Sequence, residues 1–470
     1  MAVKPDEKEV AFIVRGEVFV TQVAYNTTKR ITNTIAQERW VSWSPDGKTL
    51  IYSSEREGNW KIYKAVMANP EENLFSRATT IREELLISTG KDAVQASFSP
   101  DGKEIAFFDA RTSLSVFNLA TKQIRVLMDG KQNYSYTDGD QYFQWSPDGK
   151  WIAVNYTPSQ IFVPEAGLIA ADGKSAAVNI TLSGYSDNSP AWMMNGNCII
   201  WFSDRDGYRS HGSWGAEDDV YAMFLNQKAY DRFKLTKEEL ELLKEKEKKE
   251  KEAADKAKEK EKDKKKSKEE TIKKDSLIEI DLENLEERTA RLTIHSSKLT
   301  DAVLTADGDK LYYLSAFEGG YDLWVNDLKK NETKLALKLK DYAGSMKLSK
   351  DEKTLFLVSG GEMLKVDLNS YSKETIGFNS EFSVDLAAER QYMFDHVYRY
   401  IKEKFYLPGL HGVDWEYYKK EYEKFLPYIN NNMDFSEMLS EMLGELNASH
   451  TGSGYRYAMP NADQTASLGV

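Results

Sequence analysis

The chain contains 470 residues, carries a formal net charge of −12 and has a single cysteine. The acidic balance argues against a surface that binds nucleic acid or anionic membranes, and no apolar stretch approaches the roughly 20 residues of a membrane span. The length exceeds what one ordinary hydrophobic core organises, so we expect a large domain joined to a smaller one.

A short turn sequence recurs along most of the chain. Ser-Pro-Asp-Gly occurs at residues 44–47, 99–102 and 146–149, each time after an aromatic residue and before an alternating apolar run. Proline fixes φ and glycine lets the chain reverse, so each copy predicts a strand, a tight turn and a strand. Weaker copies extend the series, and the aligned Asp or Asn positions are 6, 46, 101, 148, 195, 307 and 351.

The spacing of these copies predicts the architecture. All but one of the intervals fall between 40 and 55 residues, near the roughly 40–50 residues of a four-stranded propeller blade. We therefore predict a mainly β fold, a seven-bladed β-propeller over residues 1–380, whose first blade is cut short by the start of the chain. Six blades with a closing strand is the alternative.

The one long interval, 112 residues, has a visible cause. Residues 234–275 are rich in Lys and Glu, a composition that cannot bury apolar surface and is typical of a solvated helix or disorder. Charges of both signs alternate, so the segment is not expected to bind nucleic acid. We interpret it as a surface insertion within the fifth blade.

Beyond residue 380 the apolar period changes from that of strands to that of helices. One amphipathic helix includes Met393 to Phe405, a second follows Asp414, and a third is expected to begin at Asp434 as N-cap, with Glu437 close to a capping box. The sequence thus predicts a small helical domain over residues 381–458, followed by a tail over residues 459–470.

This helical stretch resembles the first part of the catalytic region of tricorn-like serine proteases, relatives of the tail-specific proteases. In that family a seven-bladed propeller stands directly upstream, and a Gly-Glu-Leu-x-x-Ser-His string closes the last helix. The matching features are Phe405-Tyr406, Leu410-His411-Gly412-Val413-Asp414-Trp415, Tyr422, Leu426-Pro427, the helix at residues 438–446 and Ser449-His450.

The resemblance implies a serine peptidase that hydrolyses peptide bonds in oligopeptides. His450 would be the general base, and Ser449 would belong to the network that orients its imidazole. The family's nucleophilic serine and acidic partner lie downstream, beyond a PDZ-like domain. The chain stops at Val470 without a Gly-x-Ser-x-Gly elbow, so we expect an inactive fragment whose propeller guides or filters peptides.

The resemblance also implies a homo-hexamer and a cytoplasmic location. The N-terminus has no apolar signal core. A periplasmic or secreted location nevertheless stays open, because the first blade is expected to be truncated. Substrate preference is not readable from the sequence.

Two other functions are considered. A non-enzymatic TolB-like propeller that acts as a protein-interaction scaffold would carry the same repeat, although it would not need the helical domain. A prolyl-oligopeptidase relative would have an α/β-hydrolase domain after its propeller, which the helical segment does not resemble.

No cofactor or metal site is expected. The remaining histidines, His211, His295, His396 and His411, lack ligand spacing. Cys198 stands in an apolar strand and is interpreted as core packing. The acidic residues at 204–206 and 217–219 fit hairpin turns better than calcium binding.

Overall fold

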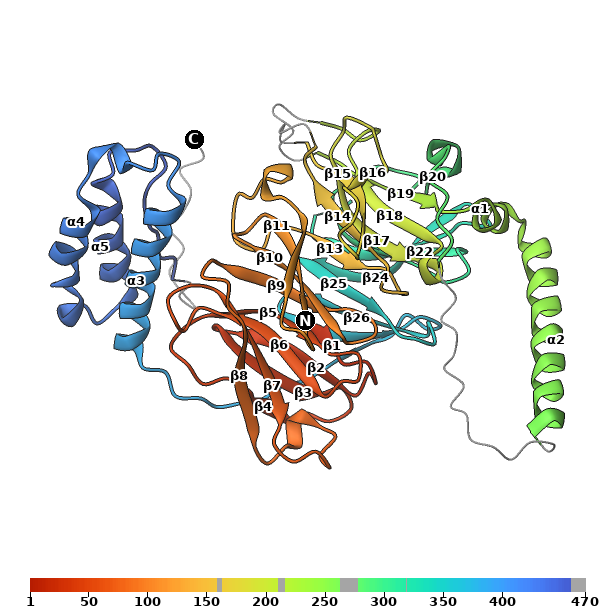
Figure 1. Cartoon of the computed structure of the whole chain (residues 1–470), viewed down its shortest axis with the longest axis horizontal. Helices are drawn as coiled ribbons and strands as arrows, with labels where there is room; N and C mark the ends of the chain where they lie inside the picture. The colour runs from red at the N-terminus through yellow and green to blue at the C-terminus, as the bar shows by residue number, and fades with distance from the viewer. Residues whose placement is uncertain (159–162, 210–215, 263–277, 318, 458–470) are drawn as a thin grey trace, which may run out of the picture. The chain divides into compact units, whose positions relative to one another are not determined.

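The computed structural model describes residues 1–158, 163–209, 216–262, 278–317 and 319–457 (Figure 1). The chain divides into two compact units, one comprising Met1–Thr32 and Glu38–Ser380, the other Asn33–Gln37 and Glu381–Val470. The predicted tail at residues 459–470, His211 and the last part of the Lys/Glu-rich segment lie outside the described residues.

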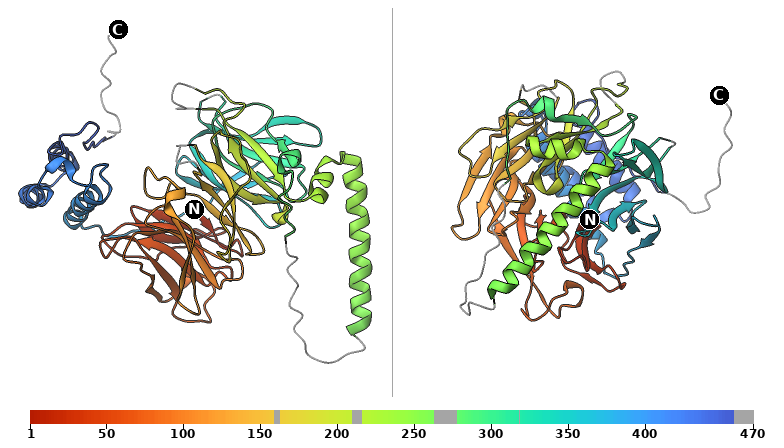
Figure 2. Two further views of the ribbon diagram at one scale, coloured as in Figure 1. Left: turned by 45° about the horizontal axis from the view of Figure 1, so that its top comes forward. Right: turned by 90° about the vertical axis from the view of Figure 1, so that its right-hand side faces the viewer.

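The described residues of the first unit form seven antiparallel four-stranded sheets, each continuous in sequence (Figures 1 and 2). The first four sheets are β1 (Ala2–Val3), β2 (Glu9–Val14), β3 (Glu17–Gln22), β4 (Thr28–Arg30); β5 (Glu38–Trp43), β6 (Thr49–Ser54), β7 (Lys61–Met67), β8 (Ile81–Ile87); β9 (Ala93–Phe98), β10 (Glu104–Asp109), β11 (Ser113–Asn118), β12 (Ile124–Met128); β13 (Phe143–Trp145), β14 (Trp151–Tyr156), β15 (Glu165–Ala170), β16 (Val178–Asn179). The last three are β17 (Asp187–Met193), β18 (Cys198–Ser203), β19 (Asp219–Phe224), β20 (Thr289–Arg291); β21 (Leu299–Leu304), β22 (Lys310–Ser315), β23 (Tyr321–Asp327), β24 (Glu332–Asp341); β25 (Ala343–Leu348), β26 (Thr354–Ser359), β27 (Glu362–Asp367), β28 (Lys373–Thr375).

The seven-bladed prediction is confirmed, and the six-bladed alternative is not. The expectation that the first blade is incomplete is wrong in its strand number. All four strands are present, because Ala2 and Val3 pair with Ala11 and Val10 as a short innermost strand.

The Ser-Pro-Asp-Gly turns are held by one repeated set of hydrogen bonds. The hydroxyls of Ser44, Ser99 and Ser146 donate to the carboxylate two residues on at 2.6, 2.7 and 2.6 Å. Each hydroxyl also accepts the N–H that opens the next strand. The glycines have φ of 67° to 70°, a left-handed conformation that costs glycine little. Partial burial raises the pKa of Asp46, but hydrogen bonds from Ser44 and Lys48 outweigh it and lower that pKa.

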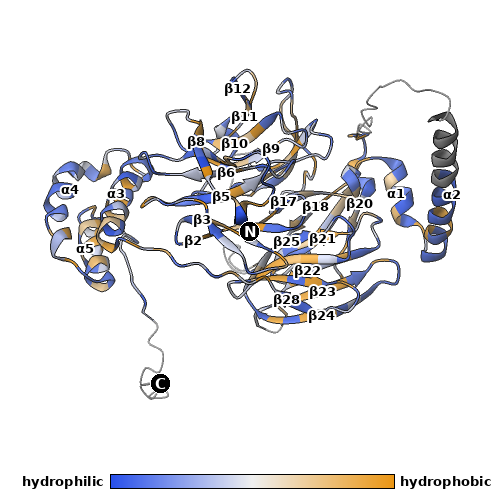
Figure 3. Cartoon of the chain, turned by 90° about the horizontal axis from the view of Figure 1, so that it is seen from below, coloured by the Kyte–Doolittle hydropathy of each residue, from blue (hydrophilic) through white to orange (hydrophobic). Residues whose placement is uncertain are grey.

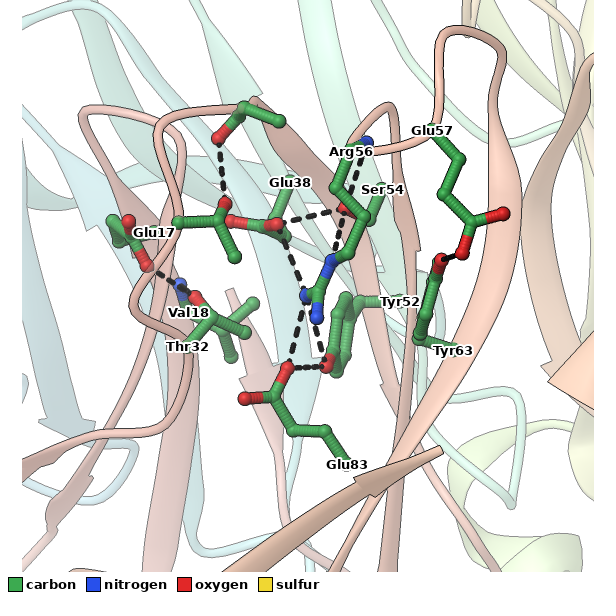
Figure 4. A network of polar contacts seen from close by, with 12 residues as sticks. Glu17, Val18, Thr32, Glu38, Tyr52, Ser54, Arg56, Glu57, Tyr63 and Glu83 are labelled. Carbon is green, nitrogen blue, oxygen red and sulfur yellow. Dashed lines mark hydrogen bonds and ion pairs between the residues drawn. The ribbon is translucent and has the colours of Figure 1, made fainter. Parts of the chain in front are cut away.

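A second repeated contact joins the third strand of a sheet to the segment beyond its fourth strand (Figure 4). Glu17, the first residue of β3, accepts the hydroxyl of Thr32 at 2.5 Å, and that hydroxyl accepts the N–H of Val18 at 2.9 Å. The equivalent acid–threonine pairs are Glu165 with Thr181 and Asp219 with Thr293. Thr181 and Thr293 likewise accept the N–H of the residue after the acid, so each hydroxyl both donates and accepts.

Apolar clusters between successive sheets form the core of the propeller. They join the first sheet to the second, the second to the third and fourth, and so on to the seventh. The seventh and first sheets meet instead through smaller contacts: Glu7 accepts the N–H of Lys350 at 2.8 Å, Thr21 donates to the carbonyl of Gly377 at 3.1 Å, and Phe12 lies against Phe378. The ring therefore closes through side chains, without a shared sheet.

The Lys/Glu-rich segment at residues 234–275 lies between β19 and β20 of the fifth sheet. The helix α1 (Gln227–Lys234) leads into it, and α2 (Lys237–Lys262) lies within it. Its start is not wholly solvated, which corrects the expectation that the segment buries no apolar surface. Leu240 is 3% exposed, and Lys244 forms an ion pair with Asp307 in the turn after β21. The exception arises because the almost purely charged composition begins only at about residue 244.

The second unit contains α3 (Leu386–Lys404), α4 (Trp415–Glu423) and α5 (Asn432–Gly444) around an apolar core. Figure 3 shows hydrophobic and hydrophilic segments alternating along these helices. The predicted inner face of the last helix is buried: Phe435, Met438, Leu439, Met442, Leu443 and Leu446. Its predicted N-cap is wrong, because Asn431 accepts the N–H of Asp434 and starts the helix earlier. Asp434 thus lies in the first turn.

Short 3-10 helices complete the described structure: η1 (Phe75–Arg77), η2 (Gly130–Gln132), η3 (Met194–Gly196), η5 (Leu285–Arg288), η6 (Leu410–Gly412) and η7 (Leu426–Tyr428). None of the helices in the described ranges is both long and apolar enough to cross a membrane.

Candidate functional site

The Gly-Glu-Leu part of the family string is anchored firmly in the helical core. α5 ends at Gly444, and Leu446 is completely buried just after it. Glu445 accepts the hydroxyl of Tyr422 at 2.9 Å. Burial and this hydrogen bond raise the pKa of Tyr422 to about 12, so the phenol remains a donor at neutral pH. The residues that follow therefore leave the core from a fixed point.

Ser449 and His450 lie side by side on an exposed turn. The hydroxyl of Thr451 donates to the carbonyl of Ala448 at 2.9 Å and closes this turn. His450 has φ of 61°, a left-handed conformation that costs a non-glycine residue of order 1 kcal/mol. Within the described ranges neither Ser449 nor His450 has a side-chain hydrogen bond. The imidazole is therefore open to groups that this part of the chain does not supply.

His411 supports that turn, a role that the sequence did not reveal. Its Nδ1 lies 2.9 Å from the carbonyl oxygen of Leu446. Because a carbonyl only accepts, Nδ1 carries a proton; in the neutral imidazole Nε2 then accepts the hydroxyl of Tyr406. His411 follows Leu410 in the left-handed region, with φ of 56° and 46°. Each of these conformations costs a non-glycine residue of order 1 kcal/mol. The Leu-His-Gly motif in the family resemblance was the only available signal.

The propeller contains a cavity at the first strands of its fourth, fifth, sixth and seventh sheets. A hollow of about 700 Å³ is lined by β13, β17, β21, β25 and the turns after them. A smaller chamber of about 230 Å³ shares Tyr142, Ala191, Asp301 and Ala302 with it. The first strands of neighbouring sheets contact one another, so this cavity lies in the central channel of the ring.

Asp301 and Tyr142 are the ionisable groups common to both hollows. Burial raises the pKa of Asp301 to about 6, although hydrogen bonds from the N–H groups of Met346 and Ala302 oppose the rise. Burial, followed by the charge of Asp301, raises the pKa of Tyr142. The channel wall therefore holds a buried carboxylate near a neutral phenol. The sequence did not point to either residue. Lys347, Lys350, Asp351 and Glu352 also line the larger hollow.

Across residues 1–158, 163–209, 216–262, 278–317 and 319–457, no group of three or more His, Cys, Asp or Glu side chains is placed to hold a metal ion. Cys198 is buried in β18, and burial raises the pKa of its thiol.

Comparison with known proteins finds matches in both units. Residues 2–139 match the TolB beta propeller domain, and residues 386–444 match the Tricorn protease C1 domain. The chain is tricorn-like in fold and in domain order. The resemblance expected from the sequence is thus confirmed.

Individual relatives agree with these matches. The chain is 22% identical over 324 residues to tricorn protease homolog 2 of Streptomyces coelicolor, covering 65% of this chain and 27% of that protein. It is 25% identical over 393 residues to a tricorn-like protease C-terminal subunit of Sulfurisphaera tokodaii, covering 78% and 40%. The crystal structure of the tricorn protease superposes with a TM-score of 0.68 at 14% identity, over 95% of this chain and 41% of that one. This chain therefore spans well under two thirds of these proteins.

Proposed function

We propose that this chain is part of a tricorn-like serine peptidase that hydrolyses peptide bonds in oligopeptides. The observation that carries the proposal is the exposed Ser449-His450 pair, which directly follows the segment that matches the Tricorn protease C1 domain. A structural histidine at a helix end would be expected to cap it or to pack against it. His450 does neither within the described residues, whereas His411 donates a hydrogen bond to the carbonyl of Leu446, two residues after α5 ends.

The chemistry follows from the position of His450. Its neutral imidazole would accept the proton of a serine hydroxyl that attacks the peptide carbonyl, and would return that proton to the leaving amine. Ser449 would link the imidazole to an acidic residue and fix its tautomer. The nucleophile and the acid would come from sequence outside these 470 residues, so we expect the chain alone to be inactive.

The propeller would guide or filter peptides toward that site. Support comes from the channel cavity of about 700 Å³, which could admit an extended chain more readily than a folded domain. By family resemblance we further propose a homo-hexamer and a cytoplasmic location, with the periplasm as the alternative that the TolB-like propeller leaves open.

A peptidase assay on two forms of the protein tests this proposal. The purified 470-residue chain should not cleave fluorogenic oligopeptides. The native protein, including any sequence that follows Val470 in its gene, should cleave them. Cleavage by the 470-residue chain that survives His450→Ala would refute the assignment of the base.

The second candidate function is a protein-interaction scaffold, favoured by the TolB beta propeller match over residues 2–139. A scaffold would bind proteins without turnover, and a stop codon directly after codon 470 in the native gene would favour it. A PDZ-like segment followed by a Gly/Ser-rich nucleophile motif would favour the peptidase.

A further inference from the structure

Asp301 is a carboxylate in the channel wall without an ion pair among the described residues, although Lys347 and Lys350 line the same hollow. It lies on β21 and is partly buried. Its Oδ2 accepts the N–H of Met346 at 2.6 Å, and its Oδ1 accepts the N–H of Ala302 at 2.9 Å. Within the described parts of the chain it forms no ion pair. A carboxylate has about four acceptor positions, so these two neutral donors leave acceptor capacity and the negative charge unmatched.

The chamber beside Asp301 has further polar atoms without partners. The hydroxyl of Thr300 and the indole N–H of Trp201 are buried without a hydrogen bond in the described structure, and both residues line the 230 Å³ chamber. Trp201 is only 1% exposed. Buried polar groups normally have a hydrogen-bond partner, because an unsatisfied buried donor or acceptor costs of order 1–3 kcal/mol. Two polar groups without hydrogen-bond partners and a carboxylate without an ion pair, all in residues that line this chamber, indicate a site for a polar ligand.

The strands around the chamber share the same backbone feature, a β-bulge. β17, β21 and β25 each change register at a bulge, which displaces Ser189, Thr300 and Ser345 from regular pairing. Ser189 and Ser345 have φ of 55° and 56°, so both bulges hold a non-glycine residue in the left-handed region. Bulges redirect side chains and are frequent beside functional sites. Here they shape the walls around Asp301.

The charge and the donors define what the chamber would take. A cation is required to match Asp301, and the Thr300 hydroxyl is free to accept a second hydrogen bond from it. The indole N–H of Trp201 is a donor only, suited to a carbonyl oxygen. A metal ion is disfavoured because the described residues offer no cluster of three ligating side chains. An ammonium group next to a carbonyl, as in a peptide, offers both kinds of partner.

We propose that the chamber formed by Asp301, Thr300 and Trp201 binds the primary ammonium group of a peptide in the propeller channel. This inference rests on the proposed function, because it assumes that peptides enter the channel. It adds a preference that the tricorn likeness does not supply: a free amino group, from the N-terminus or from a lysine side chain, anchors the peptide at the wall between the fifth, sixth and seventh sheets.

Isothermal titration calorimetry on the 470-residue chain tests the proposal with four probes. These are glycinamide, Ala-Ala-Ala-amide, its N-acetylated form, and N-acetyl-Ala-Lys-Ala-amide. The variants are Asp301→Asn, whose single side-chain oxygen can accept the N–H of Met346 while the N–H of Ala302 loses its acceptor, and Asp231→Asn as a matched control. Asp231 is exposed on α1, and its carboxylate accepts a hydrogen bond from the side-chain amide of Gln227.

The expected result is binding of Ala-Ala-Ala-amide about tenfold or more tighter than its acetylated form, as for a charge-assisted hydrogen bond. Asp301→Asn should erase the difference and Asp231→Asn should keep it. Asp301-dependent binding of the acetylated lysine peptide would identify the lysine side chain as a second source of the ammonium group. Equal affinity for the free and acetylated peptides in the wild-type chain would overturn the proposal without any variant.

The outcomes also separate this inference from the proposed function. Asp301-dependent binding of glycinamide, with no hydrolysis by the native protein, would support the ammonium site and refute the peptidase proposal. Hydrolysis that depends on His450, with no Asp301-dependent binding of any amine, would keep the peptidase and remove the site. Absence of binding by all four probes would likewise overturn the chamber proposal.

Discussion

The channel of the propeller and the turn at residues 447–450 differ in how much of their site the chain itself supplies. Around Asp301 the walls come from several sheets, and backbone N–H groups hold the carboxylate on both oxygens. Around His450 the imidazole stands exposed without a hydrogen bond from the described residues. Under our proposals, the first would be a binding region that the chain completes, and the second a half-site that needs groups from elsewhere. The position of that half-site depends on the core beneath it.

The largest predicted loss of stability should come from a substitution in the apolar core beneath the turn at residues 447–450. Leu446 is fully buried, and Leu446→Ala should destabilise the helical unit by about 2–5 kcal/mol, since it removes packing and leaves a cavity. Urea unfolding followed by tryptophan fluorescence and circular dichroism measures this loss. Ser449→Ala, on the exposed turn, is the control and should change stability by no more than about 0.5 kcal/mol. Equal effects would show that the turn is not anchored by the core.

The next effect concerns the pH dependence of the channel. The pKa of Asp301 is raised to about 6 by burial, from about 3.9 in an unfolded chain. Its ionisation therefore destabilises the fold, fully above about pH 6 and not below about pH 4. Tyr142 and the charged side chains of Lys347, Lys350, Asp351 and Glu352 line the same cavity.

Asp301→Asn should thus gain stability relative to the wild type as pH rises from 4 to 8, by about 2 kcal/mol. Thermal unfolding at several pH values measures the difference between the two chains. A difference that is constant across this window would mean that the carboxylate is not buried as the structure describes.

A smaller effect should come from His411. His411→Ala removes the hydrogen bond to the carbonyl of Leu446 and should cost about 1 kcal/mol. Amide hydrogen exchange at residues 446–451 should become faster, because the turn loses its external support. His295→Ala, at an exposed position in the propeller, should leave that exchange unchanged. Unaltered amide exchange in His411→Ala would show that His411 does not position the turn.

The sequence predicted features that local chemistry determines. The Ser-Pro-Asp-Gly turns use hydrogen bonds within five residues, so they are readable from the chain, and their spacing predicted seven blades. The N-cap of α5 was predicted three residues late, because Asn431 and Asp434 are both good caps and only the folded turn decides between them.

The channel site could not be predicted, since it depends on contacts between strands far apart in sequence. Asp301 faces Tyr142 from another sheet and bonds to the N–H of Met346 from a third. The bulges that shape the chamber leave no sequence signal, because serine and threonine are ordinary strand residues. His450 was singled out only through the family string, and its exposure gives no chemical role without a partner.

The most direct test of the central claim is kcat/KM for oligopeptide hydrolysis by the native protein, including any sequence that follows Val470. His450→Ala should lower it by about 10²–10⁴-fold, as expected for loss of a general base, while His295→Ala should leave it unchanged. Hydrolysis that is equally fast in both variants would contradict the assignment of His450 and the peptidase function built on it.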